Sequence, residues 1–319
     1  VTSGSFMTNF EKFTLDQFPL RDNFRQVKSL FHYYVMQYRD NNDIYMQDGY
    51  AVKLEYPLNP DSVKQAALRF NTVYNRFLKD SGSSVYLAIV PDKSYFLAQE
   101  NGYLAMDYQA FFELVEKEMP WATPIDLRDT LDITDYYYTD THWRQEKLLD
   151  TARKICQAMG VAAPEEKDFT QVALDKPFYG VYYGQAALPM KPETMYILHS
   201  DVLDGCTTSL GVMDPKTGEM TYQKLYDSVY DMEKDMYETY LSGAQSLLRI
   251  ENPNATSDKE LIIFRDSFGS SISPLLVQGY KTVTIVDIRY ISSGMLGRFI
   301  DFSGQDVLFL NSTGNALLP

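Results

Sequence analysis

The sequence predicts an α/β fold in which a parallel or mixed β-sheet is covered by helices on both faces. Short apolar runs rich in β-branched residues recur along the chain, and segments with helical periodicity separate most of them. This alternation of strand and helix is typical of α/β proteins. The chain has 319 residues, of which 45% are hydrophobic and 14% aromatic, so it can bury a sizeable core.

The expected elements follow in chain order. Residues 10–40 begin as a polar entry and continue as a helix that Asp22 and Asn23 can cap. The apolar residues at helical spacing in this segment are Phe24, Val27, Leu30, Phe31 and Tyr34. The pattern of residues 43–54 predicts a hairpin with Gln47, Asp48 and Gly49 as its turn. Further helices are expected over 60–80, 107–119 and 144–160 and within 268–279, and strands over 85–90, 124–127, 195–199, 247–250, 261–264, 282–286 and 307–310.

Residues 163–245 interrupt the regular alternation. They contain a turn-rich stretch at 178–184 and a predicted hairpin over 213–222 that turns at 216–218. We expect a turn- and strand-rich insertion or lid here, beside the functional site. The organisation we predict is a single domain over 1–319 that carries this insertion.

Composition excludes several classes of partner. The formal net charge is −14 and no basic stripe interrupts it, which disfavours nucleic acid and anionic membrane surfaces. Three histidines make a multi-histidine metal site improbable, and we expect no metal or cofactor. Cys156 and Cys206 are far apart in sequence, so pairing and free thiols both stay open. Neither a transmembrane run nor a signal peptide is visible, and an upstream targeting segment or membrane anchor is left open.

Ser267 is the strongest candidate for chemistry. It follows the apolar run 261–264 and precedes a helix-compatible stretch, which is the arrangement of a serine at the carboxyl end of a buried strand. A helix that begins just after Ser267 would direct free N–H groups at an oxyanion. Pro274 favours a start nearer to Ser273, because proline belongs in a first helical turn. A plain helix N-cap is the alternative role of Ser267.

Asp140 and His142 supply what a serine nucleophile needs. A serine hydroxyl requires a general base, and histidine serves as one when a carboxylate holds its other ring nitrogen. Because Asp140 and His142 are two residues apart, extended backbone would place both side chains on the same side. A loop or capping role for this pair stays open. Phe268 and Trp143 are expected to be packing residues.

Several segments resemble the DHHW family, which is similar to alginate O-acetyltransferases of the SGNH-hydrolase-like group. The matching segments keep the family's order: DQFPLRD at 16–22, YTDTHW at 138–143, RDSF at 265–268 and VDIRY at 286–290. The resemblance implies an SGNH-hydrolase-like sheet flanked by helices. It also implies a triad with Ser267 as nucleophile, His142 as base and Asp140 as its carboxylate. Thr141 departs from the family's name motif, where histidine is usual, but both triad residues of this segment remain.

The oxyanion and substrate contacts are less specific. Besides the N–H of Ser267, a second oxyanion donor is expected from the turn 242–245, which contains Gly243 and Gln245, or from residues 180–184. The resemblance leads us to expect asparagine after Gly243, and Ala244 stands there instead. Arg289 and Tyr290 are candidates to bind an anionic or sugar group. Alternatively, the arginine pairs with a neighbouring aspartate.

Together these observations predict an extracytoplasmic or cell-surface O-acetylesterase or O-acetyltransferase. Its partner would be a surface polysaccharide or another acetylated glycan, with water or a sugar hydroxyl as acyl acceptor. The 25 tyrosines suit either carbohydrate contacts or an amphipathic core and rim. A non-catalytic carbohydrate-binding or polysaccharide-assembly protein on the same fold is the rival hypothesis.

Overall fold

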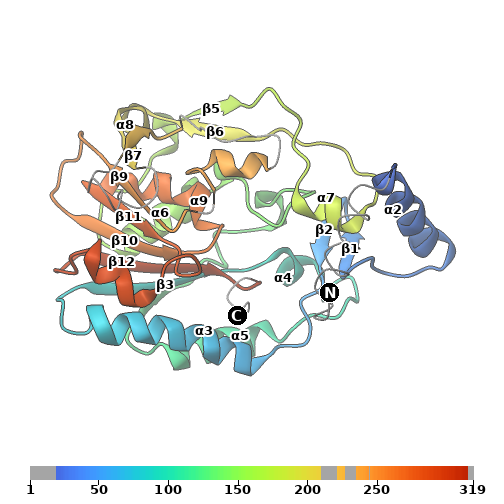
Figure 1. Cartoon of the computed structure of the whole chain (residues 1–319), viewed down its shortest axis with the longest axis horizontal. Helices are drawn as coiled ribbons and strands as arrows, with labels where there is room; N and C mark the ends of the chain where they lie inside the picture. The colour runs from blue at the N-terminus through green and yellow to red at the C-terminus, as the bar shows by residue number, and fades with distance from the viewer. Residues whose placement is uncertain (1–18, 210–220, 227–234, 244, 315–319) are drawn as a thin grey trace, which may run out of the picture.

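A large mixed β-sheet forms the centre of the protein. The structure is a computed structural model that describes residues 19–209, 221–226, 235–243 and 245–314. Within these ranges the central sheet has eight strands (Figure 1). Across the sheet they are β4 (Thr123–Ile125), β3 (Ser84–Val90), β12 (Asp306–Ser312), β10 (Glu260–Arg265), β11 (Thr282–Val286), β9 (Leu247–Glu251), β7 (Thr207–Ser209) and β8 (Tyr222–Lys224). The strands from β4 to β11 run parallel, and the pairs β11–β9, β9–β7 and β7–β8 are antiparallel.

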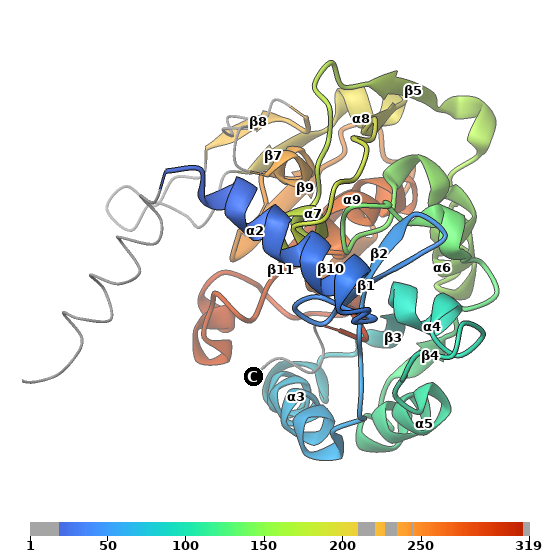
Figure 2. The same ribbon diagram turned by 90° about the vertical axis from the view of Figure 1, so that its right-hand side faces the viewer.

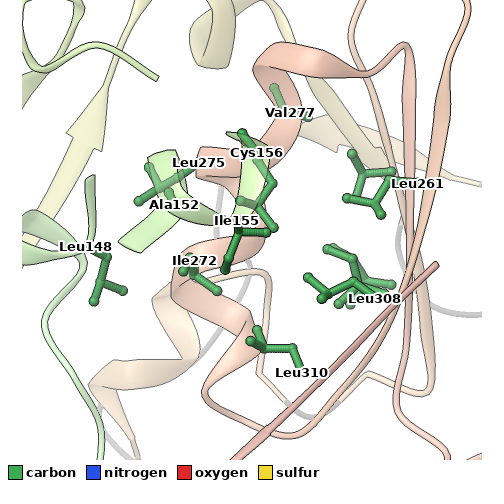
Figure 3. Close-up of a cluster of buried hydrophobic side chains, with 14 of the residues drawn as sticks. Leu148, Ala152, Ile155, Cys156, Leu261, Ile272, Leu275, Val277, Leu308 and Leu310 are labelled. Carbon is green, nitrogen blue, oxygen red and sulfur yellow. The ribbon is translucent and has the colours of Figure 1, made fainter. Parts of the chain in front are cut away.

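Helices cover both faces of this sheet, because the central strands are apolar on both sides. In β10, Leu261 and Ile263 point into one core, whereas Ile262 and Phe264 point into the other. The first core lies under α6 (Leu149–Ala158), α9 (Gly269–Ile272) and the 3₁₀ segment η7 (Ser273–Gly279), as Figure 3 shows. The second core lies under α3 (Pro60–Val73), α5 (Tyr108–Glu118) and the 3₁₀ segment η8 (Ser293–Arg298).

Smaller elements lie around the central sheet. Two two-stranded sheets pair β1 (Ile44–Gln47) with β2 (Tyr50–Lys53) and β5 (Thr170–Ala173) with β6 (Tyr196–His199). The remaining α-helices of the described ranges are α2 (Arg21–Leu30), α4 (Lys93–Leu97), α7 (Val181–Ala186) and α8 (Asp201–Gly205). The π-helical segments η1 (Phe31–Val35) and η2 (Tyr74–Leu78) continue α2 and α3, and 3₁₀ turns are η3 (Ile133–Asp135), η4 (Gln145–Lys147), η5 (Glu166–Asp168) and η6 (Met236–Thr239).

The predicted α/β class, the hairpin over 43–54 and the strands β3, β4, β9, β10, β11 and β12 of the central sheet are confirmed. The strand predicted over 195–199 is β6, which belongs to a separate two-stranded sheet, and β7 and β8 were not predicted. The expected cap of the first helix was wrong. Leu20, in a left-handed conformation, precedes α2, and no side chain caps the helix. Residues 213–220 of the hairpin predicted over 213–222 lie outside the described ranges. β7 and β8, on either side of that gap, extend the central sheet, so the segment 163–245 contributes to the main body. A single domain over 1–319 stays a prediction.

Two further findings concern the cysteines and the membrane. Cys156 and Cys206 are both buried free thiols, and burial raises the pKa of each to about 12. In the described part of the chain, no helix combines the length and the apolar character needed to cross a bilayer.

Candidate functional site

Ser267 lies in a tight turn between β10 and α9, at the carboxyl end of a central parallel strand. Asp266 fixes this turn. One oxygen of its buried carboxylate accepts a hydrogen bond from the N–H of Phe268 (3.0 Å), and the other accepts from the N–H (2.7 Å) and hydroxyl (2.8 Å) of Ser312 in β12. The turn is therefore tied to the neighbouring strand, and Ser267 stays half-buried at its apex.

The helix after Ser267 differs in detail from the expectation. α9 begins at Gly269, and Pro274 falls in the first turn of the 3₁₀ segment η7, where its missing N–H costs nothing. The N–H groups of Phe268, Gly269 and Ser270 already donate to Asp266 or Ser267. Within the described residues, the N–H of Ser267 itself has no acceptor. One free backbone donor therefore remains beside the Ser267 hydroxyl, and not the several free N–H groups of a helix N-terminus that we expected.

His142 and Asp140 complete a hydrogen-bonded chain to the serine. The Nε2 atom of His142 lies 2.7 Å from Oγ of Ser267, and its Nδ1 atom lies 2.5 Å from Oδ1 of Asp140. If Nδ1 carries the proton, it donates to Asp140 and leaves Nε2 free to accept from the serine hydroxyl. The structure thus brings together Ser267, His142 and Asp140 from segments 125 residues apart.

The Asp140–His142 contact forms in a way that the sequence did not indicate. The backbone over 138–142 bends and is not extended. Oδ1 of Asp140 accepts a hydrogen bond from the backbone N–H of His142 (2.9 Å), and this Asx turn brings the ring to the carboxylate. Burial tends to raise the pKa of Asp140, but His142 and the N–H donors hold it below its ordinary value. Asp140 is thus a carboxylate at neutral pH.

Aromatic rings enclose the histidine. The ring of Tyr237 stacks on that of His142 with centroids 3.8 Å apart and planes 9° apart, and Phe268 packs against it at 4.9 Å. Trp143 donates through Nε1 to the Phe268 carbonyl (3.0 Å) and the Ser271 hydroxyl (2.9 Å). Phe268 and Trp143 are therefore packing residues, as expected. Tyr237, which the sequence did not single out, limits the orientations open to His142.

Residues 180–183 support Asp140 and do not form an oxyanion hole. Val181 N–H donates to Oδ2 of Asp140 (2.8 Å), and the N–H groups of Gly180, Tyr182 and Tyr183 donate to Thr139. An added Cβ at Gly180 would lie 2.3 Å from Cβ of Asp140, so only glycine fits there. The expectation that residues 180–184 supply the second oxyanion donor is wrong for these four N–H groups, because each is already used.

Lys93 is a buried cation that the sequence reasoning missed. It follows β3 at the start of α4, is 2% exposed, and donates through Nζ to the carbonyl of Tyr137 (3.0 Å). Burial lowers the pKa of Lys93 to about 7, and the charges of Asp140, Glu193 and Asp92 oppose this shift only in part. A lysine directly after a predicted strand end was the available signal, but exposure is the usual fate of such a residue.

Gly243 and Gln245 lie next to the serine strand. The carbonyl of Gly243 accepts from Nη2 of Arg265, two residues before Ser267 (3.1 Å), and the side chain of Gln245 donates to the Ser242 carbonyl (3.1 Å). Leu241, Ser242 and Gly243 have φ of 54°, 60° and 70°. Consecutive left-handed residues are costly and persist where the surroundings enforce them, often at functional sites.

Arg289 and Tyr290 behave differently from each other. Arg289 donates through Nε (2.9 Å) and Nη2 (2.6 Å) to both oxygens of the buried Asp287, so it pairs with a neighbouring aspartate, which was the alternative to ligand binding. Nη1 of Arg265 also lies 3.8 Å from Asp287. Tyr290 is 57% exposed, and the guanidinium of Arg289 lies over its ring, 5.5 Å from the centroid.

A cavity of about 610 Å³ lies on the other side of the Asp140 loop. Tyr138, Arg144, Glu193 and Tyr196 are among the residues that line it. The Glu193 carboxylate accepts hydrogen bonds from the N–H groups of Tyr138 (2.9 Å) and Thr139 (2.8 Å), directly before Asp140. Glu193 in the wall of the cavity is therefore hydrogen-bonded to the backbone that leads directly into Asp140, through Tyr138 and Thr139.

Several solved structures have an architecture similar to that of this chain. A DHHW family protein from Eubacterium siraeum superposes with a TM-score of 0.68 at 20% identity, covering 88% of this chain and 94% of that one. PatB1 of Bacillus cereus, solved with a sulfonyl adduct, superposes with a TM-score of 0.64 at 20% identity over 86% and 95%. The O-acetyltransferase domain of Pseudomonas putida AlgJ gives 0.51 at 12% identity over 86% and 92%.

These likenesses show an SGNH-hydrolase-like fold. No curated protein sequence matches the chain. The profile of the DHHW family, described as "DHHW protein", matches residues 127–286, which is half of the chain and includes Asp140, His142 and Ser267. The chain therefore belongs to the DHHW family.

Proposed function

We propose that this chain is an extracytoplasmic serine O-acetylesterase or O-acetyltransferase that acts on a surface polysaccharide. The observation that carries the proposal is the unbroken chain of contacts from Asp140 through His142 to Ser267, at 2.5 Å and 2.7 Å. The name of the AlgJ domain, an O-acetyltransferase on the same fold, supports acetyl as the acyl group. The location and the glycan rest on the resemblance to DHHW and alginate-group proteins.

The reaction follows from the geometry in two steps. Oγ of Ser267 attacks the ester carbonyl while Nε2 of His142 takes the hydroxyl proton, and the N–H of Ser267 donates to the oxyanion. When the oxyanion collapses, the C–O bond to the leaving alcohol breaks and His142 gives the proton to that alcohol. In the second step, water or a sugar hydroxyl attacks the acyl-enzyme, His142 takes its proton, and the proton returns to Ser267 as the serine ester breaks.

We propose that the turn around Gly243 supplies the second oxyanion donor through the side-chain amide of Gln245, because the backbone N–H groups of Gly243 and Gln245 already donate to the carbonyls of Tyr240 (3.4 Å) and Gly243 (2.9 Å). Its left-handed residues are held against the base of the serine strand by the hydrogen bond from Arg265. The cost of such a conformation favours a functional reason for it. Gln245 belongs to the same turn and is a candidate to contact the acyl group.

We propose the cavity behind the Asp140 loop as a glycan subsite. A volume of about 610 Å³ suits a short saccharide, and the tyrosines in its wall offer flat apolar faces with a polar tip. Tyr138 is 39% exposed and Tyr196 is partly exposed. Tyr290 is a separate candidate for a glycan contact.

The test of the nucleophile uses p-nitrophenyl acetate and mass spectrometry. Ser267→Ala should lower kcat/KM by about a thousandfold or more, whereas Ser270→Ala, a buried serine three residues further on, should stay close to wild type. The wild type, stopped during turnover, should carry an acetyl adduct on the peptide that contains Ser267. Equal rates for wild type and Ser267→Ala, with no adduct, would favour the non-catalytic carbohydrate-binding alternative.

A further inference from the structure

The helix α2 and the segment η1 that continues it carry a concentrated apolar surface that faces away from the protein. Of the 18 exposed large hydrophobic side chains in the described ranges, eight fall within residues 20–38, so this is a patch and not a scatter. They are Leu20, Phe24, Val27, Phe31, Tyr34, Val35, Met36 and Tyr38. Seven of them, all except Met36, recur at intervals of three or four residues, so they form one stripe along α2 and η1.

The opposite side of the same helix is fixed to the protein. Ser29 is buried, and its hydroxyl donates to the carbonyl of Ala186 (3.0 Å), while Asn41 donates to both of these groups. Arg25 donates through Nη2 to the carbonyl of Gly184 (2.8 Å). α2 is thus attached to α7 along one side, and it lies at the edge of the molecule (Figures 1 and 2). The side chains of the apolar stripe are exposed there.

A row of positive charge runs beside the stripe. Arg21, Arg25 and Lys28 follow each other at spacings of three or four residues, and Asp22, the acidic residue of α2, lies 3.6 Å from Arg25. This row corrects the expectation that no basic stripe interrupts the net charge of −14. An apolar face rich in Phe and Tyr, flanked by Lys and Arg, is the composition of helices that lie in the plane of a bilayer surface.

We propose that α2 and η1 form an interfacial surface that docks this protein on an anionic lipid bilayer. The overall negative charge disfavours such a surface elsewhere on the molecule, so binding is confined to this edge and orients the protein. A second copy of the chain is the less favoured occupant, because it would bring an identical row of positive charge to the same interface. Docking here leaves the triad intact, since α2 contacts α7 and not Ser267 or His142.

The test is co-sedimentation of the full chain with lipid vesicles. One set contains phosphatidylcholine alone, and the other contains phosphatidylcholine with about 30% of the anionic lipid phosphatidylglycerol. The wild type should pellet with the anionic vesicles at low salt and much less at about 1 M salt. The double variant Val27→Ser, Phe31→Ser should lose about ten- to a hundredfold in partition coefficient. Lys28→Gln should lose about fivefold.

A matched control distinguishes docking through α2 and η1 from nonspecific adsorption of exposed apolar side chains to vesicles. Leu68 in α3 is 57% exposed, similar to Phe31 at 51%, and Leu68→Ser should bind vesicles like wild type. All variants should keep wild-type hydrolysis of p-nitrophenyl acetate, or wild-type circular dichroism if the chain is inactive. The proposal is overturned if wild type fails to pellet with anionic vesicles, or if the double variant pellets as well as wild type. A dimer that the double variant disperses, without vesicle binding, would equally overturn it in favour of a second copy.

Discussion

Removing the buried charge of Lys93 should stabilise the protein, and the gain should depend on pH. Nζ of Lys93 is enclosed by the rings of Tyr50 and Tyr182, at 5.8 Å and 5.0 Å, and by the carbonyl of Tyr137. No carboxylate among the described residues is within ion-pair distance of it, so the ammonium is only partly compensated. Methionine has a similar length and no charge, and Lys93→Met therefore removes the desolvation cost.

The magnitude follows from the pKa of Lys93, which burial lowers from 10.5 to about 7. The folded state then binds fewer protons than the unfolded state between about pH 7 and pH 10.5, so the stability of wild type rises with pH across this window. At pH 7 the penalty is on the order of 4 kcal/mol, and by pH 9 it falls by about 2 kcal/mol. The variant leaves the Tyr137 carbonyl without its donor, at a cost of about 1–3 kcal/mol. We expect a net gain of about 1–3 kcal/mol at pH 7.

The assay is urea unfolding of wild type and Lys93→Met at pH 7, 8 and 9. Lys64→Met, at an exposed position in α3, serves as the control and should show no pH-dependent difference from wild type. The advantage of Lys93→Met should shrink by about 2 kcal/mol from pH 7 to pH 9. A constant difference across this range, or a variant less stable than wild type at pH 7, would refute the reasoning that an uncompensated ammonium is buried here.

Three further predictions concern the groups around His142, each measured as kcat/KM on p-nitrophenyl acetate with circular dichroism as the check on folding. Asp140→Asn should lower kcat/KM about 10⁴-fold, because an amide has one oxygen and cannot accept hydrogen bonds from both His142 and Val181. A decrease of less than tenfold would show that Asp140 has no part in the mechanism. Gly180→Ala should lower kcat/KM at least about tenfold, because the added methyl group would lie 2.3 Å from Cβ of Asp140. Gly184→Ala is the control and should leave kcat/KM unchanged, because no described atom outside its own helix lies within 4 Å of its added methyl group. Tyr237→Leu should lower kcat/KM about three- to tenfold, whereas Tyr237→Phe should leave it unchanged, because phenylalanine keeps the ring stacked on His142. Equal decreases in the two variants would assign the effect to the tyrosine hydroxyl.

The glycan subsite gives one more expected result. Tyr196→Ala should raise KM for an acetylated oligosaccharide by about tenfold and leave hydrolysis of p-nitrophenyl acetate unchanged, because the small ester does not reach the cavity. A parallel fall in both reactions would place Tyr196 in the folding of the loop and not in glycan binding.

Most of the sheet could be predicted from the sequence, because its strands are buried on both faces. Such strands appear as continuous apolar runs bounded by turn residues, and the run 85–90 corresponds to β3 and the run 261–264 to β10. The short edge strand β8 was missed, because its residues Tyr222–Lys224 carry a single hydrophobic side chain. The apolar spacing in α2 correctly indicated a helix, but it could not indicate that the stripe stays exposed.

The site was only partly accessible to the same reasoning. The Ser267, His142 and Asp140 constellation has a chemical signature of residue types that complement one another, and this signature does not depend on the backbone between them. The parts that hold it do depend on tertiary packing. Gly180 fits against Asp140, and Tyr237 stacks on His142, because segments distant in sequence meet there. No local pattern encodes such a meeting.

The position of β12 also bears on how the chain can fold. This strand is the last in the described part of the chain, yet it lies between β3 and β10 and pairs in parallel with both. Without it, β3 and β4 are separated from the other strands of the sheet, so a nascent chain cannot close its sheet before residues 306–312 are available. We expect a stop codon ahead of Asp306 to give a protease-sensitive product, even though every residue of the proposed triad would already have been synthesised.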